Sequence, residues 1–198
     1  MNRQANSSIL ELELVSAQFN EAVEIFKSIN SKIISLSQSA ELRVKYGKDF
    51  YFSKNGNWTK EAFIYAPRKG VFLTKNSPII KNANDAVQAH KNKSEYFLTD
   101  EQVEEALINS IRVFGINIST KKFKDNEITV FAFGDLAEKY GNFLYELGVK
   151  EMPINLTCFS DKPFARQMYF NGFYNKSALN SIGTLFSDYK LCGMKNLK

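Results

Sequence analysis

The spacing of apolar residues changes along this chain, and that change restricts the fold more than any other feature of the sequence. Leu10, Leu12 and Leu14 alternate with glutamates, which is the two-residue period of a strand with one buried face. After Ser16, taken as the N-cap, apolar residues recur at three- and four-residue spacing as far as Leu36. We therefore expect a strand followed by one long amphipathic helix.

A period of two returns between about residues 41 and 75. Leu42, Val44 and Tyr46 alternate with polar residues, and turn-forming segments rich in Gly, Pro and Asn separate the short alternating runs that follow. Short strands joined by tight turns are typical of an antiparallel β-meander. The sequence therefore predicts a β-meander at about 41–75.

The second half of the chain alternates helical and strand patterns. Thr99 followed by Gln102 is a capping box, so a helix is expected to begin there. The other patterns predict helices over 84–91, 135–147 and 164–170, and strands over 96–98, 128–133, 154–159 and 184–192. Such alternation beside a meander indicates helices packed on a mixed sheet. We expect a single α+β domain over residues 1–198, with the α/β class as the neighbouring alternative.

Length and composition restrict the class of protein. A chain of 198 residues can bury one substantial core, and no apolar run approaches the ~20 residues that cross a bilayer. Glutamates interrupt the N-terminal apolar stretch, so we expect no export signal. Cys158 and Cys192 are too few for a disulfide scaffold and are expected to be free, buried thiols. These features predict a cytoplasmic protein without membrane association.

Positive charge is concentrated in one part of the chain. Residues 41–93 hold eleven Lys or Arg and four acids, so this segment carries a charge of +7 and the rest of the chain about −2, which gives the net +5. Aromatic residues are interleaved with these cations, as on surfaces that follow a phosphate backbone and stack bases. We predict that nucleic acid or an acidic partner is bound by Arg43, Lys45, Lys48, Lys54, Trp58, Arg68 and Lys69. The alternative is a solvated basic face whose aromatics lie in the core.

Sequence motifs for catalysis are missing. The single histidine, His90, is expected to sit in water at the end of a helix. We find no nucleophile elbow, zinc motif or Gly-rich phosphate loop, so no catalytic residue, metal or cofactor is expected. A magnesium site made of carboxylates alone is the open alternative, with the candidates Asp125, Glu127, Asp135, Glu138, Asp161 and Asp188.

Residues 163–173 resemble the final helix and Gly-Phe turn of acetyl-CoA-dependent N-acetyltransferases. The pyrophosphate-binding loop of that family has no counterpart upstream in this chain. The alternative function is therefore a small enzyme with a dispersed site, either an acetyltransferase-like transferase or a carboxylate-metal nuclease.

A second resemblance involves residues 127–135 (EITVFAFGD) in a chain rich in Ser, Asn, Ile, Lys and Tyr. The chain resembles the small archaeal-specific accessory subunit of the type III-B CRISPR effector, the Cmr complex. This resemblance implies a non-catalytic homodimer in an RNA-guided antiviral ribonucleoprotein, with other protein subunits and RNA as partners. It transfers no functional residue. Our leading interpretation is a non-catalytic interaction protein, an accessory subunit of an intracellular assembly.

Overall fold

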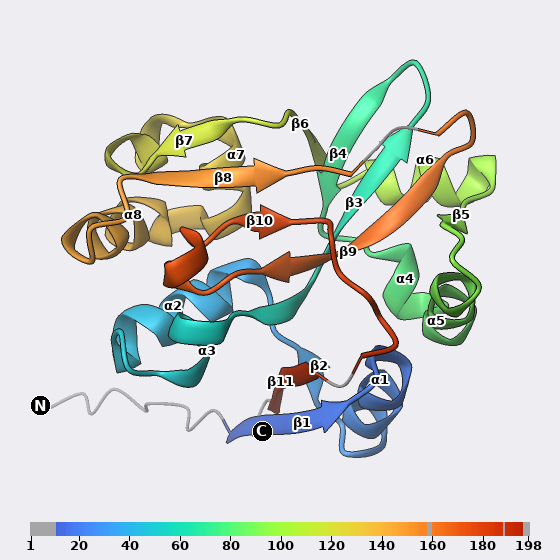
Figure 1. Cartoon of the computed structure of the whole chain (residues 1–198), viewed down its shortest axis with the longest axis horizontal. Helices are drawn as coiled ribbons and strands as arrows, with labels where there is room; N and C mark the ends of the chain where they lie inside the picture. Colours follow the sequence, from blue (N-terminus) through green and yellow to red (C-terminus); the bar gives the residue numbers. More distant parts are fainter. Residues whose placement is uncertain (1–10, 158–159, 188, 196–198) are drawn as a thin grey trace, which may run out of the picture.

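Two β-sheets organise the chain in the computed structural model (Figure 1), which describes residues 11–157, 160–187 and 189–195. The smaller sheet is antiparallel and joins the two ends of the described chain. Its strands follow the order β1 (Glu11–Ala17), β11 (Tyr189–Lys195) and β2 (Lys32–Ile33). Because β1 pairs with β11 along its whole length, the expected first strand is confirmed.

The larger sheet is mixed and has long strands at its centre. In spatial order its strands are β6 (Ser110–Val113), β4 (Gly70–Thr74), β3 (Asn57–Ala66), β9 (Phe164–Phe170), β10 (Leu179–Asn180), β8 (Glu151–Asn155) and β7 (Asn117–Ser119). A short strand, β5 (Tyr96–Phe97), also pairs with β9. Of the described pairs, β8 and β10 run parallel and the others are antiparallel.

Helices cover both faces of the larger sheet (Figure 1). One face packs against α2 (Leu36–Tyr46), α7 (Glu127–Phe133) and α8 (Ala137–Glu146). The other face packs against α1 (Phe19–Ser28), α4 (Pro78–Lys81), α5 (Ala83–Lys91) and α6 (Asp100–Leu107). The connections contain α3 (Tyr51–Asn55) and the 3-10 turns η1 (Thr120–Asp125), η2 (Gly134–Leu136) and η3 (Phe173–Asn175). This arrangement of helices and sheet in one unit is the expected α+β class.

The central strand β3 divides its side chains between two cores. Phe63 and Tyr65 lie in the core below α2, α7 and α8, whereas Ile64 and Ala66 lie in the core below α1, α4, α5 and α6. A strand covered on both faces is apolar on both faces. That is why β3 reads as a nearly continuous apolar run at this point.

The predicted β-meander at 41–75 is wrong in its first half. Residues 36–46 and 51–55 are the helices α2 and α3, and strands begin only with the β3–β4 hairpin. Ser35 caps α2 in a capping box with Gln38, whose backbone N–H donates to the Ser35 hydroxyl at 3.1 Å. The apparent alternation of Leu42 and Val44 is part of a helical face, since Ala40 and Leu42 are buried and Tyr46 is exposed.

Two further predicted elements change type. The expected strand at 128–133 is α7, because the Asn126 side chain accepts hydrogen bonds from Ile128 and Thr129 and starts a helix despite the β-branched residues. The expected helix at 164–170 is β9 at the centre of the sheet. Its apolar residues face both cores, so their spacing imitates a helical stripe.

The expected first helix ends earlier than predicted. It begins at Phe19, while Ser16 lies in β1, and it ends at Ser28 before Asn30 adopts a positive φ of 56°. The helices α5 and α8, the strand β5 and the capping box at Thr99 are confirmed. The last strand begins at Tyr189 rather than residue 184.

Cys192 is a free, buried thiol as expected, and burial raises its pKa to about 12. Cys158 lies outside the described residues. No helix in the described parts of the chain has the length and apolar character needed to cross a bilayer.

Candidate functional site

Two of the predicted binding residues, Arg43 and Trp58, are buried and do not form a binding surface. Both side chains are at most 2% exposed. Trp58 packs edge-on against Phe19 and Tyr169 in the core. Because neither side chain reaches the surface of the chain, the prediction that they contact a partner is corrected.

Arg43 has a structural role that explains its burial. Its guanidinium donates hydrogen bonds to the carbonyl oxygens of Phe170 and Asn171, both at 2.8 Å, and to the side chains of Asn57 and Tyr140. It also lies 3.7 Å from the centre of the Phe170 ring. Arg43 thus fastens α2 to the end of β9, and burial lowers the pKa of its guanidinium.

The same region contains a close backbone crossing. A Cβ added to Gly172 would lie 1.9 Å from the carbonyl oxygen of Lys54, and one added to Gly56 would lie 2.5 Å from that of Phe170. Only glycine permits two chain segments to pass this closely. The Arg43 hydrogen bonds therefore hold a crossing that the glycines make possible.

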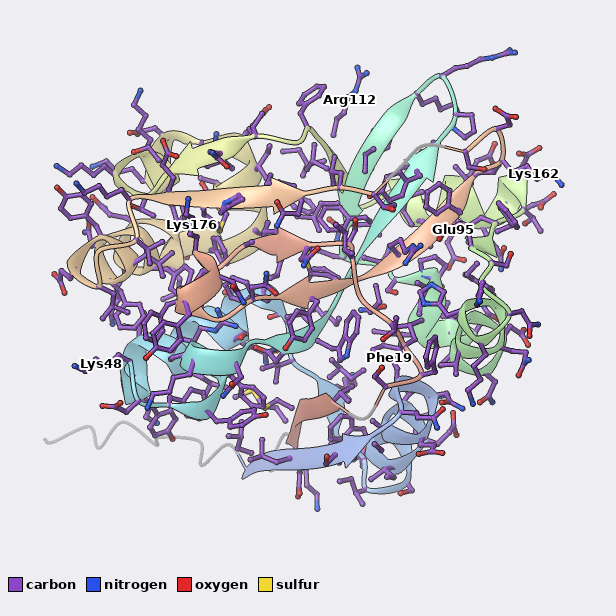
Figure 2. The ribbon with its side chains drawn as sticks, viewed as in Figure 1. Phe19, Lys48, Glu95, Arg112, Lys162 and Lys176 are labelled. Atoms are coloured by element: carbon purple, nitrogen blue, oxygen red, sulfur yellow. The ribbon has the colours of Figure 1, made fainter. Side chains whose placement is uncertain are left out.

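The other predicted binding residues are exposed or half-buried but lie in two separate places. Lys45, Lys48 and Lys54 belong to the α2–α3 region, where Lys54 forms an ion pair with Asp49 at 2.9 Å. Arg68 and Lys69 lie at the tip of the β3–β4 hairpin, on the opposite side of the view in Figure 1 from α2 and α3. Figure 2 shows Lys48 at the left edge, far from the hairpin. The structure does not bring these five residues into one surface, and their binding role stays a prediction.

Other basic residues do converge, on a cleft between α1, β2, β3 and α4. The cleft has a volume of about 310 Å³. Its lining comprises Val23, Phe26, Lys27, Ser31, Lys32, Ile33, Lys60, Lys75, Asn76, Ser77, Ile80 and Lys81. Five of these residues are lysines and none is acidic, so we call the feature the lysine-rimmed cleft.

Two of the five lysines are neutralised by nearby carboxylates. Lys27 forms an ion pair with Glu24 at 2.7 Å, and Lys81 forms one with Glu105. Lys32, Lys60 and Lys75 have no carboxylate within 4.0 Å among the described residues.

The Lys75 ammonium lies 4.6 Å from the centre of the ring of Phe131, a residue of α7 that does not line the cleft. Lys75 therefore contributes positive charge at the edge of the cleft, whereas Lys32 and Lys60 are exposed on its rim. Charges of one sign over an apolar wall raise the local concentration of oppositely charged ligands. The three unpaired lysines therefore give the lysine-rimmed cleft a positive potential.

A bulge in β3 presents Lys60 to this cleft. Pairing between β3 and β9 shifts between Trp58 and Ala62, and Lys60 donates its backbone N–H to Ile34 at 2.9 Å. Gln167 of β9 satisfies the bulge by donating to the carbonyl oxygens of Thr59 and Glu61. Thr59 and Glu61 are thereby turned inward and Lys60 outward.

The bulge is held from both sides. Ser77, which lines the cleft, donates to the Gln167 side chain at 2.8 Å. Glu61 is buried and accepts a hydrogen bond from the Leu36 backbone at 3.0 Å. Burial raises the pKa of the Glu61 carboxyl. The cleft wall is thus a fixed structure and not a loose loop.

His90 is buried, which corrects the expected exposed position. It is 7% exposed, and its Nε2 has no hydrogen-bond partner among the residues that the structure describes. Burial, together with the charge of Arg166, lowers its pKa to about 4. Arg166 forms an ion pair with Glu95, which Figure 2 shows on the right side of the molecule. His90 is therefore neutral at pH 7 and packs beside an ion pair.

The candidate magnesium ligands do not form a group. Asp125, Glu127, Asp135, Glu138 and Asp161 are exposed, and Asp188 lies outside the described residues. In the described parts of the chain, no three His, Cys, Asp or Glu side chains are placed together as metal ligands. Sequence reasoning also missed Lys27, Ser31 and Lys32, because they precede the basic segment and reach the cleft only through folding.

No family model and no curated protein matches the sequence of this chain. A solved structure, described as accommodating massive sequence variation in Nanoarchaeota by the C-type lectin fold, matches with a TM-score of 0.70. The match covers 97% of this chain and 100% of that chain, at 11% sequence identity. The chain has a C-type lectin fold. At this identity the likeness concerns the C-type lectin fold and not a ligand.

Proposed function

We propose that this chain is a non-catalytic binding protein, located in the cytoplasm, that holds an acidic partner at the lysine-rimmed cleft of a C-type lectin fold. One observation carries the proposal. Lys32, Lys60 and Lys75 come from three separate segments, converge on one cleft and have no carboxylate partner among the described residues. Unpaired cations collected in this way favour anionic ligands.

The fold agrees with a binding role. The matched structure is described as accommodating massive sequence variation by the C-type lectin fold. A fold that tolerates such variation can change its surface residues while its core is kept. In this chain the surface residues that stand out are cationic, so the partner is acidic.

The experiment is elution from a heparin column, with heparin as the polyanionic probe. We expect the variant Lys32→Glu/Lys60→Glu/Lys75→Glu to elute at much lower salt than the unaltered protein, because close ionic contacts weaken as charges are reversed. The matched control reverses three other exposed lysines, Lys91, Lys122 and Lys139, and produces the same change in net charge. Equal losses in both variants would contradict a specific site.

The proposed assembly follows the sequence resemblance. We propose that the partner complex is an RNA-guided antiviral ribonucleoprotein of the CRISPR type, in which this chain is a homodimeric accessory subunit. Its support is the basic segment 41–93, which supplies Lys60, Lys75 and Lys81 to the cleft. Purification of the native complex, with mass spectrometry of its proteins and sequencing of any RNA, tests this assignment. A purified complex without RNA or CRISPR subunits would contradict it.

A further inference from the structure

The floor of the lysine-rimmed cleft is mainly aliphatic. Val23, Ile33 and Ile80 contribute branched alkyl side chains. The ring of Phe26 lies against the backbone of β11, since a Cβ added to Gly193 would lie 2.6 Å from its Cε1. A ring held in this way is 1% exposed and gives no stacking face to a nucleobase. Val23 and Ile33 are also buried, at 3% and 7% exposed, so the half-buried Ile80 supplies most of the accessible apolar surface of the floor. This surface is aliphatic and favours an alkyl chain over a base.

The volume of the cleft limits the length of that chain. The space measures about 310 Å³, and a water molecule occupies ~30 Å³ in the liquid. Roughly ten non-hydrogen atoms therefore fit, which corresponds to about eight carbons and two head-group oxygens. A longer chain would extend into solvent.

The polar atoms of the cleft are mostly donors. The Ser31 hydroxyl belongs to a residue that is 5% exposed, and it has no hydrogen-bond partner in the described parts of the chain. Lys32, Lys60 and Lys75 carry ammonium groups, which only donate. An ionised carboxylate or phosphate only accepts, so it complements this set. The Ser31 hydroxyl is held in place by its burial, so it can donate a hydrogen bond of defined direction to the head group, whereas the lysine ammonium groups lie on flexible side chains.

We propose that the lysine-rimmed cleft binds a small amphiphilic anion, an alkyl chain of about eight carbons with a terminal oxyanion. The alkyl chain lies on Ile80 beside Val23 and Ile33, and the oxyanion is held by Ser31 and the exposed ammonium groups of Lys32 and Lys60. This assignment rests on the function proposed above and names the ligand class of the same cleft. It does not depend on the CRISPR assembly.

Calorimetric titration of the unaltered protein with straight-chain carboxylates tests the alkyl part. From acetate to octanoate, each buried methylene should raise the affinity about fourfold, and the increase should stop near octanoate because the cleft is then full. Acetate binding as tightly as octanoate would overturn the proposal but leave anion binding in place. No binding of any of these anions, together with equal heparin elution of the two lysine variants, would overturn both.

Two further ligands test the head group. Octyl glucoside has the same chain without a charge, and it should bind at least tenfold more weakly than octanoate. Equal binding would overturn the proposal. Octyl phosphate separates the two oxyanions, since tighter binding of octyl phosphate assigns a phosphate head and tighter binding of octanoate assigns a carboxylate.

Two variants test the contributions of the apolar floor and of the Ser31 hydroxyl to binding separately. Ile80→Trp fills the cleft and should lower octanoate affinity at least tenfold while heparin elution stays unchanged. Ser31→Ala removes only the hydroxyl and should lower octanoate affinity about fivefold. Unchanged octanoate affinity in both variants would overturn the proposal, and the chain-length series on the unaltered protein does not depend on the folding of either variant.

Discussion

Arg43 offers the sharpest test of the fold, because sequence reasoning and structure give it different roles. The sequence predicted a surface residue that binds an acidic partner, whereas the structure places it in the core between α2 and β9. The substitution Arg43→Met keeps most of the aliphatic bulk and removes every guanidinium hydrogen bond. A structural residue would lose stability, and a binding residue would lose affinity.

The size of the expected loss follows from the acceptors left behind. The carbonyl oxygens of Phe170 and Asn171 lose donors at 2.8 Å, and each buried acceptor without a donor costs roughly 1–3 kcal/mol. Removing a buried charge relieves its desolvation and offsets part of that cost. We expect a net loss of about 3 kcal/mol, which is a large fraction of the ~5–15 kcal/mol of a typical domain.

Urea unfolding measures this loss directly, provided that the m-value is unchanged. Lys45→Met on the exposed side of the same helix is the matched control, and its stability should change by less than about 0.5 kcal/mol. If Arg43→Met cost less than about 1 kcal/mol and instead weakened heparin binding, the structural account of Arg43 would be refuted.

The other predictions concern buried titratable groups and the glycine crossing. Glu61→Gln should stabilise the protein at pH 7 by about 1 kcal/mol or more, because burial raises the pKa of the Glu61 carboxyl above its usual value of 4.5 and the folded state therefore loses stability as the pH rises above 4.5. Urea unfolding at pH 7 and pH 3 should show the gain in stability only at pH 7. A gain at both pH values would contradict the burial argument. Burial lowers the pKa of His90 from 6.5 to about 4, so the free energy of unfolding should fall by up to about 2–3 kcal/mol as the pH drops from 6.5 to 4. His90→Gln should flatten the dependence of stability on pH in this range. An identical slope in the variant would contradict the buried, neutral state of His90. Gly172→Ala should cost about 3 kcal/mol because its Cβ meets the Lys54 carbonyl, whereas Gly115→Ala, with its closest atom at 3.8 Å, should change stability little; equal melting temperatures for the two variants would rule out the crossing.

The sequence predicted correctly those helices that are specified by residues close together in the chain. The capping box at Thr99 and the helix predicted over 84–91 need no distant partner, and both are confirmed. The capping box of Ser35 and Gln38 is the same kind of local signal for α2, but the prediction at this point rested on the alternation of Leu42 and Val44. The Asn126 cap would likewise have indicated α7.

The central strand β9 could not be assigned from its own residues. A strand covered by helices on both faces loses the polar half of its alternation, so its period is hidden. Only its pairing with β3, β5 and β10 makes it a strand, and those partners are distant in sequence.

The basic segment 41–93 was a correct indication of where cations are enriched, but not of which ones converge. Lys60 reaches the cleft because of a bulge, and Lys32 joins it from outside the segment. Neither the bulge nor the approach of Lys32 to the cleft can be recognised from a pattern in the sequence. The aromatic half of the prediction was misplaced at Trp58, which packs in the core.

The central claim is that acidic ligands bind the lysine-rimmed cleft and not the other basic surfaces of the chain. Nuclear magnetic resonance of labelled lysine side chains, titrated with a short heparin oligosaccharide, tests it most directly. We predict that the ammonium-adjacent signals of Lys32, Lys60 and Lys75 shift most and saturate together. If the largest shifts occurred at Lys48 and Lys69, the cleft would not be the binding site.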